Sequence, residues 1–224
     1  FFSQLSPFEN KRFNTCSLVG NGGILTGSGC GKEIDASEFV FRFNMAPMDE
    51  KYLEDIGNKT NLITMNPSMI KYREESTIEV KTLTSDLSAY GDSYLWIWAF
   101  LSGKHARSAL KAQQALQGNN ARNQVILPYP IVTRSILSIW RENGIMAHRL
   151  STGLLLVSFA TQMCEEVRLY GFWPFHSDRN NRRLTEHYYD NALPGEVHRM
   201  PEEFRQLQRL HNTGVLRLTT HTCQ

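Results

Sequence analysis

Short apolar runs rich in β-branched and aromatic residues recur along the chain, separated by polar segments and glycines. Each run is four to six residues long, which is typical of buried strands rather than of helices. The pattern predicts strands at Cys16–Gly20, Phe39–Phe43, Leu62–Met65, Tyr94–Ala99, Gln124–Leu127, Val167–Tyr170 and Val215–Leu218.

Between these runs, amphipathic spacing and capping residues predict four longer helices. They are expected over Ser108–Gln117, from the cap Thr133 to Asn143-Gly144, from Ser151-Thr152 to about Cys164, and from Pro201 to Gly214. Alternating strands and helices predict an α/β fold with a largely parallel sheet, in which ligands collect at the carboxyl ends of the strands. The chain has no internal repeat or linker, so residues 1–224 are expected to form a single domain.

Composition narrows the possible partners and compartments. With 24 basic and 22 acidic residues the formal net charge is +2, which gives no general attraction to nucleic acid. No apolar run approaches the ~20 residues of a membrane span. The N-terminal segment FFSQLSPFENKR lacks the pattern of a signal peptide. We therefore expect either a cytosolic protein or a soluble fragment of a longer one.

The four cysteines lie far apart, and no pair has the C-x-x-C spacing of a zinc or thioredoxin site. Their spacing leaves open two disulfides, with three possible pairings, or four reduced and buried thiols. Asn58-Lys59-Thr60 is an N-glycosylation acceptor pattern, which favours an oxidising compartment. The cysteines are Cys16, Cys30, Cys164 and Cys223.

A glycine-rich segment follows the first predicted strand. It does not match the dinucleotide fingerprint G-x-G-x-x-G, because Leu25 stands where a pattern that starts at Gly20 requires its third glycine. A Walker A loop is excluded because Glu33 follows Lys32. The turn still offers backbone N–H groups to an anion before the start of a helix. Asn21 and Asn44, at the ends of consecutive strands, are candidate ligand contacts, with turn asparagines as the alternative.

Three further segments carry candidate chemistry. Ser151, Thr152 and Gly153 stand at a predicted helix N-terminus, which suits either a carboxylate or phosphate or a simple N-cap. His187 opens the segment HYYD, and His198 precedes a helix that carries Glu203 in its first turn. A loop histidine with a carboxylate in reach is a candidate general base, although many such histidines are structural. The spacing gives no metal signature, so no metal is predicted.

Taken in order, four segments resemble the motifs of the eukaryotic sialyltransferases (glycosyltransferase family 29), most closely the α2,8-sialyltransferase group. They are CSLVGNGGILTGSGCGKEIDASEFVFRFNMAP continuing through DIGNKTNLITMNPS, then RLSTGLLLVSFATQMCEEVRLYGFWPF, then HYYD, and finally His198-x-x-x-x-Glu203.

This resemblance implies a Rossmann-like variant of the GT-A fold. It also implies metal-independent, inverting transfer of sialic acid from CMP-sialic acid to the 8-hydroxyl of a terminal sialic acid on a glycoprotein or ganglioside. His198 would be the general base, and His187 would assist the departing phosphate of CMP. The donor contacts implied are Asn21, Asn44, Ser151, Thr152, Gly153 and Trp173.

The same resemblance implies the disulfides Cys16–Cys164 and Cys30–Cys223, and a membrane-anchored Golgi enzyme of which this chain is the lumenal catalytic domain. One departure is Phe43, which stands where the family usually has cysteine in FRCN. Because this loss leaves an even number of cysteines, we expect the bridges to be undisturbed. Another sialyl linkage, a nicotinamide-dependent oxidoreductase and a non-catalytic glycan-binding domain are the alternatives.

Overall fold

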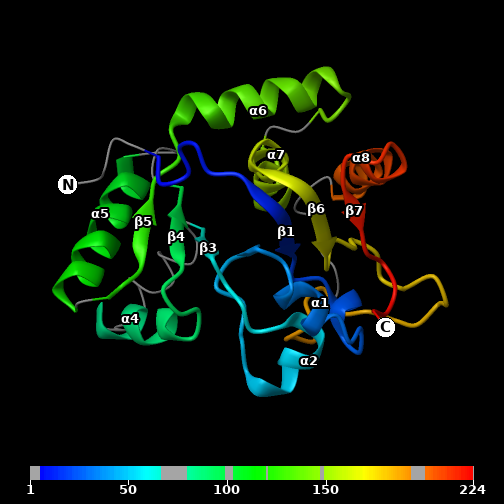
Figure 1. The fold of residues 1–224 in the computed structure, drawn as a ribbon, viewed down its shortest axis with the longest axis horizontal. Coiled ribbons are helices and arrows are strands. Elements are labelled where there is room, and N and C mark those ends of the chain that lie inside the picture. The colour runs from blue at the N-terminus through cyan, green and yellow to red at the C-terminus, as the bar shows by residue number, and fades with distance from the viewer. Residues whose placement is uncertain are drawn as a thin grey trace.

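The computed structural model describes residues 6–66, 80–98, 103–119, 121–146, 149–192 and 200–223. Within these residues a seven-stranded parallel sheet has the order β5-β4-β3-β2-β1-β6-β7 (Figure 1). All seven predicted strands are confirmed, with shifts of a few residues at their ends. They are β1 Phe13–Val19, β2 Phe39–Arg42, β3 Leu62–Met65, β4 Tyr94–Ile97, β5 Gln124–Ile126, β6 Cys164–Tyr170 and β7 Arg217–Leu218.

The four longer predicted helices are also confirmed, and the glycine segment leads into a short helix as expected. The helices are α1 Gly31–Asp35, α2 Leu53–Ile56, α4 Val80–Ser88, α5 Gly103–Gly118, α6 Pro130–Glu142, α7 Thr152–Met163 and α8 Met200–Asn212, with 3-10 turns at Gly23–Leu25 and Glu50–Tyr52. The predicted cap of α6 is wrong: Tyr129, not Thr133, is the cap. Pro130 starts this helix because proline fits the first helical position, where its missing N–H has no partner to lose.

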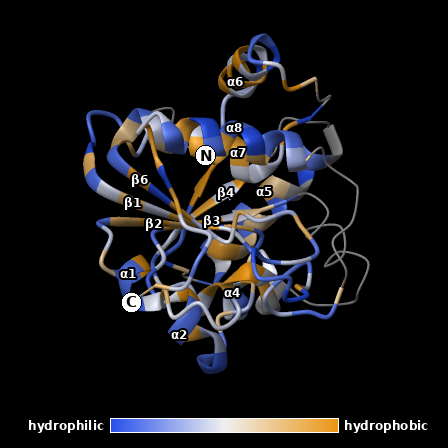
Figure 2. Ribbon diagram, turned by 90° about the vertical axis from the view of Figure 1, so that its right-hand side faces the viewer, coloured by the Kyte–Doolittle hydropathy of each residue, from blue (hydrophilic) through white to orange (hydrophobic). Residues whose placement is uncertain are grey.

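Both faces of the sheet are covered, as parallel sheets require. Leu18, Phe41 and Leu62 pack with apolar residues of α7 and α8 on one face. On the other face, β3 and β4 pack against α4 and α5, whereas Val40 packs against α1 and α2. Figure 2 shows the strands between α7 and α8 on one side and α1 and α2 on the other.

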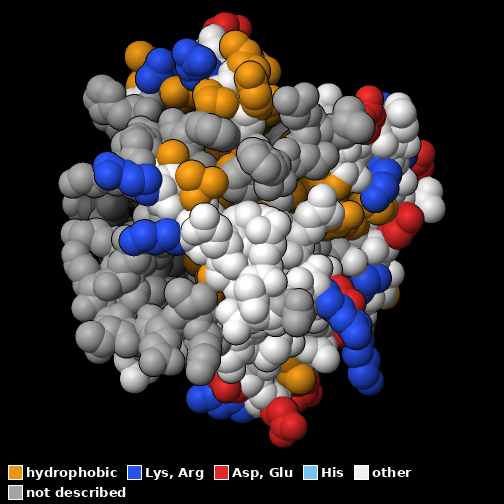
Figure 3. Space-filling view, turned by 90° about the vertical axis from the view of Figure 1, so that its left-hand side faces the viewer, with side chains coloured by type: hydrophobic (Ala, Val, Ile, Leu, Met, Phe, Trp, Pro, Cys, Tyr) orange, Lys and Arg blue, Asp and Glu red, His pale blue; other side chains and the backbone are white. Residues whose placement is uncertain are grey.

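Helix α6 lies outside the layer formed by α7 and α8 (Figure 1). Its indole anchor Trp140 is buried and donates through Nε1 to Ser158 Oγ of α7 at 2.7 Å. Hydrophobic side chains gather over this helix at the top of the face seen in Figure 3, and its exposed apolar residues are Ile131, Val132 and Ile139. In the part of the chain that is described, no helix is both long and apolar enough to cross a membrane.

The direction in which the chain adds strands to the sheet reverses between β1 and β6. From β1, the chain adds β2, β3, β4 and β5 on one side, and β6 and β7 on the other. Crossovers that leave in opposite directions separate at the carboxyl ends of β1 and β6, which creates the crevice where open α/β sheets bind ligands. The register of the pair places Val19 beside Tyr170, so the loops after both strands start at the same level.

Both disulfides implied by the family resemblance form. Cys16 of β1 is bonded to Cys164 at the start of β6, and Cys30 is bonded to Cys223 near the chain end. The cysteine replaced by Phe43 is not needed for either bridge. Phe43 is instead buried and packs edge-on against Phe172, with ring centroids 5.9 Å apart.

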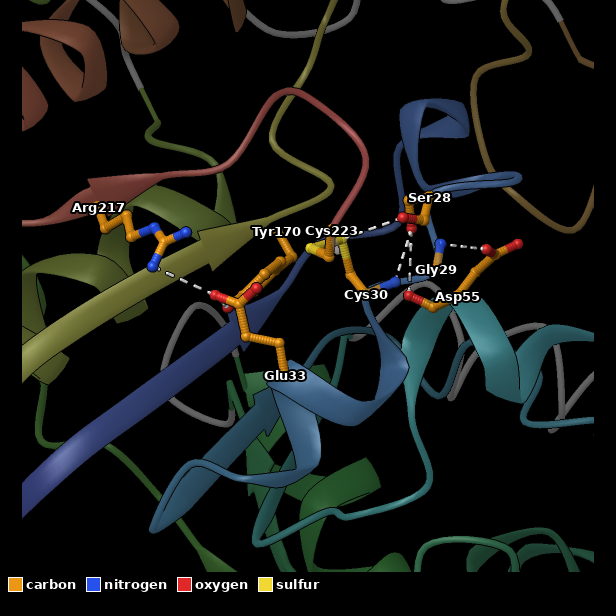
Figure 4. Close-up of a disulfide and its surroundings, with 8 residues drawn as sticks. All are labelled: Ser28, Gly29, Cys30, Glu33, Asp55, Tyr170, Arg217 and Cys223. Carbon is orange, nitrogen blue, oxygen red and sulfur yellow. Dashed lines mark hydrogen bonds and ion pairs between the residues drawn. A yellow bond between two sulfur atoms is a disulfide. The ribbon is translucent and has the colours of Figure 1, made fainter.

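The second disulfide holds the chain end against the glycine segment (Figure 4). The Cys223 N–H donates to the Ser28 carbonyl at 2.8 Å. The Asp55 carboxylate accepts the N–H groups of Gly27 and Gly29, both at 2.8 Å. Both glycines have positive φ, 73° and 64°, which favours glycine at these positions. The glycine segment is thus fixed from both sides, by α2 and by the chain end.

Replacement of this bridge by Cys30→Ala/Cys223→Ala should lower the free energy of unfolding by about 2–5 kcal/mol, because the bridge closes a very long loop. Urea denaturation followed by circular dichroism measures the change. An unchanged midpoint would show that the contacts around Ser28 and Asp55 hold the segment without the bridge.

Candidate active site

A cavity of about 700 Å³ lies at the carboxyl ends of β1, β2, β3 and β6, at the point where the strand order reverses. The first turns of α7 and α8 close it from the face that they cover. Its size is that of a pocket for a small organic ligand. Every predicted donor contact lines it: Asn21, Asn44, Ser151, Thr152, Gly153 and Trp173, together with His187.

The glycines at the cavity let two loops touch backbone to backbone. A Cβ at Gly20 or Gly22 would lie 2.8 or 2.6 Å from the carbonyl oxygen of Gly171. The N–H of Gly20 donates to Tyr170 O at 2.7 Å, and that of Gly22 to Gly171 O at 3.1 Å. These two N–H groups, which the sequence offered to an anion, therefore join the β1 loop to the β6 loop.

Asparagines follow three neighbouring strands, and each lines the cavity. Asn21 Nδ2 donates to Phe43 O at 3.2 Å, which ties the loop after β1 to the loop after β2. Asn44 has φ 56° and donates its N–H to Thr64 Oγ1. Asn66 follows β3 and was not among the residues predicted from the sequence. An asparagine at a third consecutive strand end was the signal that would have identified it.

The N-terminus of α7 forms another wall. Ser151 is the N-cap, and its Oγ accepts the Leu154 N–H at 3.1 Å. Thr152 Oγ1 donates to Asn66 Oδ1 at 3.1 Å. Gly153 allows close packing, since a Cβ there would lie 2.9 Å from the ring of Phe172. The expected helix N-terminus is therefore in place beside Asn66.

The segment HYYD places His187 at the cavity and pairs it with a carboxylate. His187 Nδ1 lies 2.5 Å from Asp190 Oδ2, and the Tyr189 ring stacks on the imidazole with centroids 5.0 Å apart. A backbone bridge to Gly22 fixes the segment beside the β1 loop. Partial burial alone would raise the pKa of Asp190, but hydrogen bonds from His187 and Ala192 hold that pKa below its ordinary value.

The remaining wall is aromatic. The rings of Trp173, Phe175 and Phe204 meet edge to face with centroids 5.1–5.3 Å apart. Trp173 Nε1 donates to Ser177 O at 2.8 Å, so its indole N–H is bonded within the protein. The predicted aromatic contact thus presents an apolar surface next to the polar wall.

The proposed base His198 lies outside the described residues, while Met200 and Pro201 line the cavity. Glu203, expected within reach of that histidine, lines the cavity and bonds to Ser151. Among the described residues, no group of three His, Cys, Asp or Glu side chains is arranged to hold a metal ion.

These observations place the chain among α/β proteins whose ligand site lies at the switch point of an open parallel sheet. Residues 2–215 match the sequence profile of glycosyltransferase family 29 (sialyltransferase), and the chain belongs to this family. Membership contradicts the nicotinamide-dependent alternative.

Curated relatives agree with this assignment. The chain is 42% identical over its whole length to mouse alpha-2,8-sialyltransferase 8F, of which it covers 56%. It is also 42% identical to bovine alpha-N-acetylneuraminide alpha-2,8-sialyltransferase, of which it covers 63%. The chain therefore spans about three fifths of the length of these relatives.

Solved structures share the fold. A crystal structure of a mammalian sialyltransferase superimposes with a TM-score of 0.66 at 22% identity, over 97% of this chain and 74% of that one. The sialyltransferase CstII from Campylobacter jejuni, in complex with cytidine-5'-monophosphate, gives 0.52 at 15% identity over 93% of this chain and 80% of that one.

The hydrogen bond between His187 and Asp190 should make stability depend on pH. Because the folded-state pKa of Asp190 is lowered, its contribution is present above the unfolded pKa and is lost as pH falls through the folded one. Asp190→Asn should therefore lower the Tm at pH 7 and do so progressively less towards pH 3. Thermal denaturation of both proteins across this range measures the difference.

Asp92→Asn, in an exposed ion pair with Arg122, is the matched control and should change the Tm little at any pH. An Asp190→Asn difference that stays constant from pH 7 to pH 3 would contradict the assigned role of the carboxylate.

Proposed function

We propose that this chain is the catalytic part of an α2,8-sialyltransferase. It transfers sialic acid from CMP-sialic acid to the 8-hydroxyl of a terminal sialic acid on a glycoprotein or ganglioside. The observation that carries the proposal is the cavity at the switch point, which gathers all the donor contacts implied by the family motifs. The names of the curated relatives support the linkage. Another sialyl linkage is the alternative.

The asparagines and the N-terminus of α7 contact different parts of the donor. Asn21 and Asn44 supply neutral amides suited to the hydroxyls and base of a nucleoside. The first turn of α7 supplies N–H groups and a favourable dipole to the phosphate. A CMP complex of CstII, which has the same fold, supports a cytidine nucleotide as the ligand class.

His187 acts on the leaving group. When the bond from sialic acid to the phosphate oxygen breaks, negative charge grows on CMP. A protonated His187 stabilises this charge, and Asp190 in turn stabilises the imidazolium. The hydrogen bond at Nδ1 leaves Nε2 for the phosphate. No metal is required, because the helix terminus and the imidazolium together offset the charge.

His198 activates the acceptor. It takes the proton of the acceptor 8-hydroxyl as that oxygen bonds to the anomeric carbon from the side opposite CMP, which inverts the configuration. The imidazole must be neutral to accept this proton, so activity falls at acidic pH.

The two disulfides support an oxidising compartment, and we place the enzyme in the Golgi lumen, anchored to the membrane in its full-length form.

Incubation with CMP-sialic acid and a panel of sialylated acceptors, followed by linkage analysis, tests the reaction. We expect α2,8-linked product, unaffected by EDTA. His198→Ala should lower kcat by about 10²–10⁴-fold, the usual contribution of a general base. CMP should raise the Tm, and NAD should not.

A Tm unchanged by CMP, with no product on any acceptor, would favour the non-catalytic glycan-binding alternative. Retention of full activity through the acidic range in both the parent and His198→Ala would show that another group is the base.

A further inference from the structure

Glu203 is a buried carboxylate that the proposed reaction does not use. It lies in the first turn of α8, is 4% exposed and lines the cavity. Its Oε1 accepts the Ser151 N–H at 2.8 Å, and its Oε2 accepts the Ser151 hydroxyl in a short hydrogen bond. Ser151 thus donates to both oxygens of a carboxylate that lies 52 positions away in the sequence. A buried charge of this kind is costly unless such bonds stabilise it.

These bonds change what Ser151 has left to offer a ligand. A serine hydroxyl has one donor and two acceptor sites. Its proton is donated to Glu203, and one acceptor site takes the Leu154 N–H. Only an acceptor site remains, and a phosphate oxygen is itself an acceptor. The Ser151 hydroxyl therefore has no proton for a phosphate while Glu203 is in place.

Thr152 is in the same position, because its hydroxyl donates to Asn66. The Leu154 N–H of this turn is donated to Ser151, so the donors at this end of the cavity include the N–H groups of Thr152 and Gly153, which have no partner inside a helix, and the side-chain NH2 of Asn66. The position of that turn is set by Ser151, which caps it, and Ser151 is held by Glu203.

We propose that Glu203 is a positioning residue of the donor site. It orients Ser151 so that the first turn of α7 presents its N–H groups to the donor phosphate, and the hydroxyls of Ser151 and Thr152 act inside the protein. This inference rests on the proposed function. It assigns to Ser151 a capping role in place of the direct donor contact that the family resemblance implied.

The alternative is a direct contact from the Ser151 hydroxyl to the donor. The two arrangements differ in the effect of Glu203→Gln. Glutamine cannot accept both donors of Ser151, so the capping geometry is lost if Glu203 positions the turn. If Ser151 contacts the phosphate itself, loss of the negative charge beside the phosphate leaves CMP binding unchanged or tighter.

Titration calorimetry with CMP and with cytidine, which lacks the phosphate, separates these outcomes. For Glu203→Gln we expect CMP to bind about tenfold more weakly or worse, the effect of losing a hydrogen bond to a charged group. Cytidine affinity should change little, which a general loss of structure would not reproduce. The KM for CMP-sialic acid should rise while the KM for the acceptor stays the same.

The double variant Ser151→Ala/Glu203→Gln should bind CMP about as weakly as Glu203→Gln alone, because both changes break one unit. Additive losses, or unchanged CMP affinity in Glu203→Gln, would overturn the proposal. Glu202→Gln, an equal change of charge one position earlier, is the matched control and should leave CMP binding unaltered. Wild-type protein that binds neither CMP nor cytidine would refute the proposed function instead.

If Glu203→Gln does not fold, Glu203→Asp tests the same point, because it keeps the charge but shortens the reach to Ser151. Weaker binding of CMP with cytidine affinity preserved is expected. Unchanged binding of CMP would overturn the proposal.

A separate feature, the segment Asn58-Lys59-Thr60, lies away from the cavity. It follows α2 and leads to the amino end of β3, whereas the cavity lies at the carboxyl ends of the strands. Asn58 is exposed. The Asp35 carboxylate accepts the N–H groups of Asn58 and Lys59, and Thr60 Oγ1 accepts a hydrogen bond from Arg42 at 3.0 Å.

We infer that Asn58 carries an N-linked glycan, independently of the reaction catalysed. The side-chain nitrogen of Asn58 bonds to the anomeric carbon of an oligosaccharide, a lipid diphosphate leaves, and the amide proton passes to a base. Transfer precedes folding of this turn, because the folded turn holds Thr60 and the backbone in hydrogen bonds. The position of Asn58 at the amino ends of the strands, opposite the cavity, keeps the glycan clear of the cavity.

Secretion of the chain from mammalian cells behind a signal peptide tests this inference. Treatment with peptide N-glycosidase F should lower the mass of the wild type and of Thr60→Ser, and should leave Asn58→Gln unchanged. Thr60→Ser keeps both the acceptor pattern and a hydroxyl for Arg42. A secreted wild type whose mass the enzyme does not change would overturn the inference.

Discussion

The backbone contact between the loops after β1 and β6 is the constraint on which the site depends. These strands pair along their length, and Cys16–Cys164 joins them covalently. Gly20 and Gly171 then meet at a distance that excludes a side chain on either. Because the crossovers leave in opposite directions from this point, the loops part above it and open a cavity. Larger residues at either glycine would push the two walls of the cavity apart.

Around that contact, the polar groups of the site are mostly bonded to one another. Asn21 bonds to the loop after β2, Asn66 to Thr152, His187 to Asp190, and Ser151 to Glu203. Three of these bonds join residues that line the cavity from different segments, and the fourth holds His187 from within its own segment, so the walls are held in place before a ligand arrives. Such preorganisation is what electrostatic stabilisation of a developing charge requires.

The strands could be predicted because burial on both faces of a parallel sheet leaves nearly continuous apolar runs. The longer helices could be predicted from their amphipathic spacing and capping residues. The start of α6 was missed because Thr133 resembles a cap, although Pro130 already fits the first turn. The four-residue helix α2 is too short to show a periodicity. Asn66 and Asp190 were visible as an asparagine at a third strand end and a carboxylate three residues after His187.

The bond between Glu203 and Ser151 could not be predicted from the sequence. A pattern shows only local neighbours such as His198, which lies outside the described residues, whereas Ser151 is 52 residues away and comes close only when α7 and α8 pack on the same face of the sheet. The bond to Ser151 matters for mechanism. A motif identifies which residues gather at a site, but a hydroxyl whose proton is already donated cannot serve a ligand as a donor. Because the hydroxyls of Ser151 and Thr152 donate within the protein, backbone N–H groups of α7 are the donors that we propose for the phosphate.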